Sequence, residues 1–266
     1  GRKTFLDFRE KAPLAATPDM YLDKDGNLVP GLSTRGHLAV AVPGTVAGLE
    51  RAREQYGTMK RSALLAPSIA LAERGFVLQQ GDVALLAPPP PDFSSDPASA
   101  AVFLNKGEAF AVGQKLVQKD LAKTLKAISR HGPGGFYKGP VAHAIVASSQ
   151  AGGGLIAQAD LDQYQARELL PVECSYRGYR VISAPPPSSG GVVLCEMLNI
   201  LEGYPLKDLG YRSAQGVHYQ IEAMRHAYVD RNSALGDPDF VKNPVDRLIH
   251  KRYAEKVRAA IHPERA

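Results

Sequence analysis

Residues 172–183 read Val-Glu-Cys-Ser-Tyr-Arg-Gly-Tyr-Arg-Val-Ile-Ser and carry the clearest β signal in the chain. Val172, Cys174 and Tyr176 alternate with polar neighbours, which is the period of a half-buried strand. Arg177-Gly178 is a turn dipeptide, and a second run of β-forming residues follows it. The stretch therefore predicts a hairpin of two antiparallel strands joined at Arg177-Gly178.

Helical patterns flank this hairpin on both sides. Apolar residues at helical spacing, with proline or a capping residue at the start and glycine at the end, predict several amphipathic helices. They run from Pro43-Gly44 to Gly57, from a first turn at Pro67 to Gly75, through Leu121 and Ile128 to Gly132, through Val141 and Ile145 to Gly152, through Leu194 and Leu201 to Gly203, and from Ser213 to Gly236.

Strand signals are few by comparison. Residues 4–8 and 37–42 each predict one short strand besides the hairpin, and the proline-rich stretch 87–99 is interpreted as a surface loop rather than a domain linker. The strands are too few to form a complete sheet beside so many helices that need covering. The simplest remedy is a set of strands supplied by a partner chain.

Composition excludes several classes of protein. Among 266 residues, 44% are hydrophobic and 22% are charged, which is an ordinary soluble composition. The net charge is +5, but the basic residues are dispersed and lack an aromatic stacking platform, so no nucleic-acid partner is expected. No apolar run approaches the length of a membrane span, and the first residues contain no signal peptide.

The two cysteines, Cys174 and Cys195, fall in a strand-like and a helix-like run. They form no C-x-x-C pair, and no histidines cluster near them. Two buried free thiols are therefore favoured over a disulfide or a metal site.

Motifs for chemistry are sparse, and each candidate has a structural alternative. Ser188-Ser189-Gly190-Gly191 places small residues at a helix start, where amides bind anions, but a packing role is favoured. Asp237-Pro238-Asp239 is favoured as a turn, so no metal and no cofactor are expected. Arg9 offers a guanidinium fork at a strand end, although composition alone favours a surface ion pair with Glu10 or Asp7.

Seven segments taken together resemble the large subunit of the γ-glutamyltranspeptidase family. Their order and rough spacing match over nearly the whole chain, and the combination is far more specific than any one of them. The segments are Asp7-Phe8-Arg9-Glu10 with Ala12-Pro13, Pro43-Gly44-Thr45-Val46-Ala47-Gly48, Tyr56-Gly57-Thr58-Met59, Gly135-Phe136-Tyr137-Lys138-Gly139, Tyr176-Arg177-Gly178-Tyr179, Pro185-Pro186-Pro187-Ser188-Ser189-Gly190-Gly191 and Leu235-Gly236-Asp237-Pro238-Asp239-Phe240.

The resemblance implies an α+β fold of the N-terminal-nucleophile (Ntn) hydrolase kind, a four-layer αββα sandwich completed by a small subunit outside this chain. Residues 1–266 would form the large-subunit portion of one such domain. Family members are zymogens that cleave themselves, and the new N-terminal threonine of the small subunit attacks the γ-glutamyl amide of glutathione. Its own α-amine serves as the base. The glutamyl group then passes to water, or to an amino acid or peptide.

The same resemblance assigns one binding residue. The family's arginine at this motif position binds the α-carboxylate of the glutamyl group, which makes Arg9 the expected substrate-binding residue and reverses the preference for a simple ion pair. No catalytic residue is expected in this chain, because the nucleophile and the oxyanion hole belong to the small subunit. One departure is that the family's large subunit starts earlier, so a missing N-terminal part is expected.

Two alternatives remain open. An acylase of the same family, which cleaves glutaryl side chains from cephalosporins, would use the same arginine, and a non-catalytic fragment or scaffold is the alternative of another class. Bacterial family members are exported, so the resemblance also implies a periplasmic or secreted protein.

Overall fold

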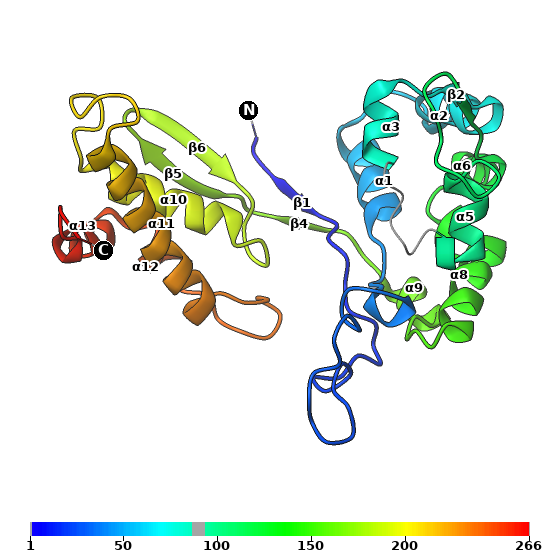
Figure 1. The fold of residues 1–266 in the computed structure, drawn as a ribbon, viewed down its shortest axis with the longest axis horizontal. Helices are drawn as coiled ribbons and strands as arrows, with labels where there is room; N and C mark the ends of the chain where they lie inside the picture. The colour runs from blue at the N-terminus through cyan, green and yellow to red at the C-terminus, as the bar shows by residue number, and fades with distance from the viewer. Residues whose placement is uncertain (1, 87–93, 266) are drawn as a thin grey trace. The chain divides into compact units, whose positions relative to one another are not determined.

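The computed structural model describes residues 2–86 and 94–265, which form two compact units. The central unit comprises Phe8–Arg167, and the terminal unit comprises Gly1–Asp7 with Glu168–Ala266. Figure 1 shows the elements of both units, which are described separately below. No helix within the described ranges combines the length and the apolar character needed to cross a membrane.

The central unit is mainly helical. Its elements are η1 (His37–Ala39), α1 (Thr45–Tyr56), α2 (Arg61–Arg74), β2 (Phe76–Val77), α3 (Gln80–Leu86), α5 (Pro97–Phe103), β3 (Lys115–Leu116), α6 (Lys119–His131), α7 (Gly134–Tyr137), α8 (Gly139–Ala151) and α9 (Gln158–Gln163). β2 and β3 form an antiparallel pair. A core of Val42, Tyr137, Ala142, Ile156 and Leu161 fills the space around α7, α8 and α9.

Among the described residues, the terminal unit contains four helices and the remaining strands, although Arg167, the first residue of β4, belongs to the central unit. They are β1 (Phe5–Asp7), β4 (Arg167–Leu169), β5 (Val172–Tyr176), β6 (Tyr179–Ser183), α10 (Gly190–Glu202), α11 (Ala214–Ala234), α12 (Val245–Leu248) and α13 (Lys251–Ala260). β1 pairs with β4, and β5 pairs with β6. α10 packs against both the hairpin and α11 (Figure 1), and its residues Val192 and Ile200 are fully buried.

The predicted hairpin is confirmed in register and turn. Val172 pairs with Ser183 and Tyr176 with Tyr179, so Arg177 and Gly178 form the two-residue connection. Both have positive φ angles, 48° and 85°, as a tight hairpin turn of the favoured twist requires. The helix stops at Gly57, Gly75, Gly132, Gly152 and Gly203 are also confirmed.

Three local predictions differ from the structure. The strand expected over 37–42 is wrong, because His37–Ala39 forms a 3₁₀ turn and only Val42 makes a β-bridge, to Lys11. Pro67 lies inside α2 rather than in its first turn. Of the loop expected at 87–99, residues 87–93 lie outside the described residues, and Pro97 already begins α5 behind the capping residue Asp96.

The longest helix exposes an apolar stripe. Val217, Ile221, Met224 and Tyr228 share one face of α11, and these residues are 39–55% exposed. The core side of the same helix is instead formed by small residues such as Ala223, which is fully buried. Small side chains let α11 approach α10 closely, so the larger side chains point away from that contact.

Candidate functional site

Arg9 lies two residues beyond the end of β1, where the sequence places it. The backbone just after Arg9 is fixed by the bridge between Lys11 and Val42. The Lys11 amide donates to the Val42 carbonyl at 3.2 Å, and the Val42 amide donates back at 2.8 Å. These two bonds align the segment that carries Arg9 with the residues leading into α1.

Two glycines of the motif Pro43–Gly48 allow α1 to approach this segment closely. A Cβ atom on Gly44 would lie 2.2 Å from the Phe8 carbonyl oxygen, and one on Gly48 would lie 2.0 Å from Cγ of the Phe8 ring. Both distances are shorter than any tolerated contact, so neither position accommodates a side chain without displacement of Phe8. Phe8 precedes Arg9 directly, so the close contacts of the two glycines with Phe8 help to fix the position of the Arg9 main chain.

Two tyrosine side chains support the same segment. The Tyr164 hydroxyl, just after α9, donates to the Arg9 carbonyl at 2.8 Å. The rings of Tyr164 and Tyr137 are parallel, with centroids 5.9 Å apart. The Tyr137 hydroxyl donates to the Pro43 carbonyl at 2.8 Å, and burial raises the pKa of Tyr137. Arg9 is therefore attached to α1 through two stacked tyrosines.

The Arg9 side chain is 53% exposed, and its Nε lies 3.3 Å from Oε1 of Glu10. The surface ion pair considered from composition is thus present. Such an exposed contact contributes little free energy, so a carboxylate ligand can replace Glu10 at small cost. The arrangement supplies a cationic donor, on an anchored main chain, that is suited to recognition of a carboxylate. The role expected for Arg9 in substrate binding stays a prediction.

The Ser188–Gly191 segment has the packing role that the sequence analysis favours. A Cβ on Gly191 would lie 2.2 Å from the Ala184 carbonyl oxygen, so this glycine is required for close approach of the backbone. The Ser189 hydroxyl accepts a hydrogen bond of 2.9 Å from Nε of Arg231 on α11. The segment therefore joins α10 to β6 and α11.

The turn role of Asp237 is confirmed, because its carboxylate accepts from the Asp239 amide at 2.9 Å. Gly152 follows the last residue of α8, which agrees with the helix stop predicted there. Within residues 2–86 and 94–265, no group of three or more histidine, cysteine, aspartate or glutamate side chains is arranged to hold a metal ion.

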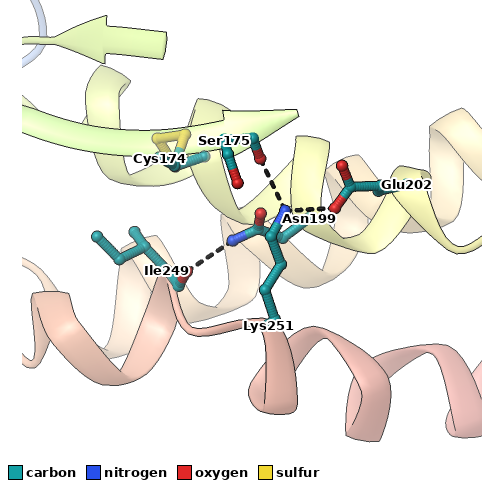
Figure 2. Close-up of a disulfide and its surroundings, with 7 residues drawn as sticks. Cys174, Ser175, Asn199, Glu202, Ile249 and Lys251 are labelled. Atoms are coloured by element: carbon teal, nitrogen blue, oxygen red, sulfur yellow. Dashed lines mark hydrogen bonds and ion pairs between the residues drawn. A yellow bond between two sulfur atoms is a disulfide. The ribbon is translucent and has the colours of Figure 1, made fainter. Parts of the chain in front are cut away.

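The prediction of two free thiols is wrong. Cys174 on β5 and Cys195 on α10 form a disulfide, with their Cα atoms 5.8 Å apart (Figure 2). The packing of α10 on the hairpin brings the two positions together across a sequence separation of 21 residues. That proximity is a tertiary property, which the spacing of two cysteines in a sequence does not reveal.

Polar contacts surround the disulfide (Figure 2). The Lys251 ammonium donates to the Ser175 carbonyl at 2.7 Å and also pairs with Glu202 at the end of α10. The Asn199 amide donates to the Ile249 carbonyl at 2.6 Å. The disulfide and these bonds together join β5, α10 and the start of α13.

Comparison with known proteins identifies the family. The Gamma-glutamyltranspeptidase family model matches residues 1–266. The chain is 68% identical to a glutathione hydrolase proenzyme of Pseudomonas sp. (strain A14), covering all of this chain and 46% of that protein. It is 42% identical to an acylase ACY 1 proenzyme of Pseudomonas sp. (strain V22), covering all of this chain and 49% of that protein. The chain thus spans about half the length of the curated relatives it matches.

A solved structure gives the same assignment. The Helicobacter pylori γ-glutamyltranspeptidase structure matches with a TM-score of 0.97 and 47% identity, covering all of this chain and 76% of that one. The expected α+β fold of the Ntn-hydrolase kind is confirmed by this match, and the described residues combine helices and strands. The resemblance noted in the seven sequence segments is confirmed as well, and the chain belongs to the γ-glutamyltranspeptidase family.

Proposed function

We propose that the complete protein of which this chain is part is a glutathione hydrolase with γ-glutamyltransferase activity. It cleaves the γ-glutamyl amide of glutathione, forms a γ-glutamyl ester on a threonine and transfers the glutamyl group to water, an amino acid or a peptide. The observation that carries this proposal is the 68% identity, over the whole chain, with a protein named glutathione hydrolase proenzyme.

In this proposal Arg9 binds the α-carboxylate of the glutamyl group. A guanidinium presents paired N–H donors that match the two oxygens of a carboxylate, which lysine cannot reproduce. Its half-exposed position and its exposed pair with Glu10 support such an exchange of partners. The residue contributes substrate recognition, while the bond-breaking step belongs to the threonine.

The proposed partner is a small subunit cut from the same precursor and beginning with that threonine. The word proenzyme in the names of the relatives supports processing, and the described residues contain three two-stranded sheets and many helices. Strands from the small subunit would complete the four-layer sandwich, so residues 1–266 and the small subunit would form one Ntn-hydrolase domain. No nucleic acid is expected to bind.

A direct test uses the full-length precursor that contains this chain. Release of p-nitroaniline from γ-glutamyl-p-nitroanilide, together with a second chain that begins with threonine by intact-mass analysis, is the expected result. Arg9→Ala raises KM by about 10- to 100-fold, because a charge-assisted contact contributes about 1.5–3 kcal/mol. Arg9→Lys recovers little. Lack of turnover in a processed protein argues against the proposal.

A glutaryl or cephalosporin acylase is the second candidate, and the 42% identity with an acylase ACY 1 proenzyme favours it. A glutaryl substrate keeps the carboxylate that Arg9 would bind but lacks the α-amino group. Comparison of kcat/KM for γ-glutamyl-p-nitroanilide and glutaryl-p-nitroanilide separates the two functions. A preference for the glutaryl compound selects the acylase. Activity on neither compound, with no threonine-started chain, selects a non-catalytic scaffold.

We also propose that the protein is periplasmic or secreted. The Cys174–Cys195 disulfide supports this location, because disulfides persist in oxidising compartments and are rare in the cytosol. Fractionation of the producing cells followed by thiol alkylation and mass analysis tests it. A protein found in the cytosol with both cysteines alkylated would contradict the proposal.

A further inference from the structure

We propose that Tyr164 is a positioning residue for Arg9, and that it sets the affinity for the substrate carboxylate through its hydrogen bond to the Arg9 main chain. The inference rests on the proposed function of Arg9. No sequence motif singled out Tyr164. Its hydroxyl donates to the Arg9 carbonyl across a separation of 155 residues, at 2.8 Å.

The Tyr164 ring is itself fixed. It is parallel to the ring of Tyr137 within 1°, and Tyr137 is only 6% exposed. The Tyr137 hydroxyl donates to the Pro43 carbonyl and accepts from the Ala47 amide at 3.3 Å, so it is fastened to the first turn of α1. A rigid aromatic side chain with few rotatable bonds transmits this fixed position to its hydroxyl group at low entropic cost.

The residues after Tyr164 are tied to the same helix. Arg51, on α1, donates to the Ala166 carbonyl at 2.8 Å. Tyr164 is thus held between α9, which precedes it, and a contact to α1 two residues later. The hydroxyl group has a defined location relative to α1 even before it meets Arg9.

Gly44 provides the space for this hydroxyl. A Cβ atom at that position would lie 1.9 Å from the Tyr164 hydroxyl oxygen and 2.2 Å from the Phe8 carbonyl oxygen. The glycine, the tyrosine hydroxyl and the main chain of residues 8–9 therefore meet at one point. A glycine and a tyrosine that are far apart in sequence therefore both contact the main chain of residues 8–9.

The anchored main chain of Arg9 limits the positions that its guanidinium can reach. The Arg9 side chain is half exposed, but its main chain is anchored at the carbonyl by Tyr164 and two residues later by the Lys11–Val42 bridge. A side chain on a fixed main chain loses less conformational entropy when it binds a ligand. Small displacements of a binding side chain weaken the binding. Removal of the anchor should therefore weaken carboxylate recognition.

The test is a double-mutant cycle in the full-length, processed protein with γ-glutamyl-p-nitroanilide as substrate. Tyr164→Phe keeps the ring and removes the hydroxyl. It should raise KM by about three- to tenfold, which corresponds to the free energy of one hydrogen bond, with a smaller change in kcat. In the Arg9→Ala background the same substitution should change kcat/KM by less than about twofold, because Tyr164 acts through Arg9.

A matched control is Tyr21→Phe. Its hydroxyl also donates to a main-chain carbonyl of the central unit, that of Leu38, at 3.5 Å, but it supports a different segment. Its KM should equal that of the wild type. Amide hydrogen exchange gives a second readout that does not depend on activity: peptides covering residues 8–12 should exchange faster in Tyr164→Phe, and peptides from α10 should not.

The outcomes separate the two proposals. If Arg9→Ala raises KM but Tyr164→Phe does not, or if Tyr164→Phe lowers kcat/KM equally in both backgrounds, the positioning role is overturned and the role of Arg9 stands. If Arg9→Ala leaves KM unchanged, the assigned role of Arg9 fails, and the positioning role fails with it. Unchanged exchange of residues 8–12 in Tyr164→Phe likewise overturns the positioning role.

Discussion

Arg61 holds the carboxylate of Glu50 in a two-point ion pair. Its Nε lies 2.9 Å from Oε2, and a second guanidinium nitrogen contacts Oε1. Arg53, one turn along α1 from Glu50, contributes a further pair at 2.7 Å. The Glu50 side chain is only 8% exposed, so this pair joins α1 to α2 in a partly desolvated setting.

Stability should depend on this carboxylate in the acid range. Hydrogen bonds from Arg61 and Arg53 lower the pKa of Glu50 to about 2. A lowered pKa means that the stabilisation is complete above about pH 4.5 and is lost as the pH falls towards 2. Glu50→Gln should therefore reduce the free energy of unfolding by about 2 kcal/mol at pH 7 and by much less at pH 2.5, measured by urea denaturation.

Asp120→Asn is the control for that experiment. Asp120 also pairs with a basic residue three positions along its helix, Lys123, but its side chain is 92% exposed. The substitution should change stability by less than about 0.5 kcal/mol at either pH. A Glu50→Gln effect as small as this one would contradict the prediction.

Gly48→Ala should destabilise the central unit. The added Cβ would lie 2.0 Å from Cγ of Phe8, close to the root of that side chain, so the ring cannot rotate out of the way. Overpacking of this kind costs about 1–3 kcal/mol. Gly134→Ala provides the comparison, because its Cβ would meet no atom within 4 Å. Thermal denaturation should show a lower Tm for the first variant and an unchanged or higher Tm for the second.

Reduction of the Cys174–Cys195 disulfide should lower the free energy of unfolding by about 3 kcal/mol, the value expected for a loop of this length. Thermal denaturation with and without a phosphine reductant measures the effect. The double variant Cys174→Ala, Cys195→Ala should melt at the lower temperature and show no response to reductant. If the reductant still lowers the Tm of the double variant, its effect does not come from the Cys174–Cys195 disulfide.

Glu196→Gln should stabilise the protein increasingly as the pH rises. Glu196, on α10, is 1% exposed, and neither carboxylate oxygen has a hydrogen-bond partner among the described residues. Burial, and then the neighbouring carboxylate of Asp230, raise its pKa, while Arg247 lowers it. Its stabilising contribution is thus complete below the ordinary pKa of about 4.3 and declines as the pH rises. Equal effects of the substitution at pH 5 and pH 8 in urea denaturation would contradict this.

Tyr204→Phe should raise Tm. The Tyr204 ring stacks on Tyr219 with centroids 3.8 Å apart, but its buried hydroxyl has no hydrogen-bond partner within the described part of the chain. Removal of an unsatisfied buried hydroxyl relieves a desolvation cost of about 1 kcal/mol. Tyr253→Phe is the opposite case, because the Tyr253 hydroxyl donates to Asp230 at 2.6 Å, and it should lower Tm.

The features predicted correctly from sequence are those that local chemistry determines. The hairpin turn at Arg177-Gly178 needs residues that tolerate positive φ, and Gly132 ends α6 with a positive φ of 62°, which glycine adopts readily. The strand expected at 37–42 was wrong for the complementary reason. An alternating pattern forms a strand only where a partner strand is available, and here only Val42 finds one.

The candidate site was predicted only in part. Arg9 was singled out only through the family resemblance, and its binding role stays a prediction, whereas the contacts that hold its main chain were not predicted. The Tyr164 contact with Arg9 spans 155 residues of sequence. The Gly44 contact with Phe8 spans more than thirty-five. The disulfide was missed for the same reason, since it depends on how α10 packs against the hairpin.

The apolar stripe on α11 affects how this polypeptide behaves when it is produced by itself. Val217, Ile221, Met224 and Tyr228 form a partly exposed apolar stripe, and contiguous apolar surfaces promote self-association. We therefore expect the chain to self-associate at high concentration when it is produced alone. Arginine or a mild detergent in the buffer should improve recovery, and co-expression with the remainder of the precursor is the preferable preparation.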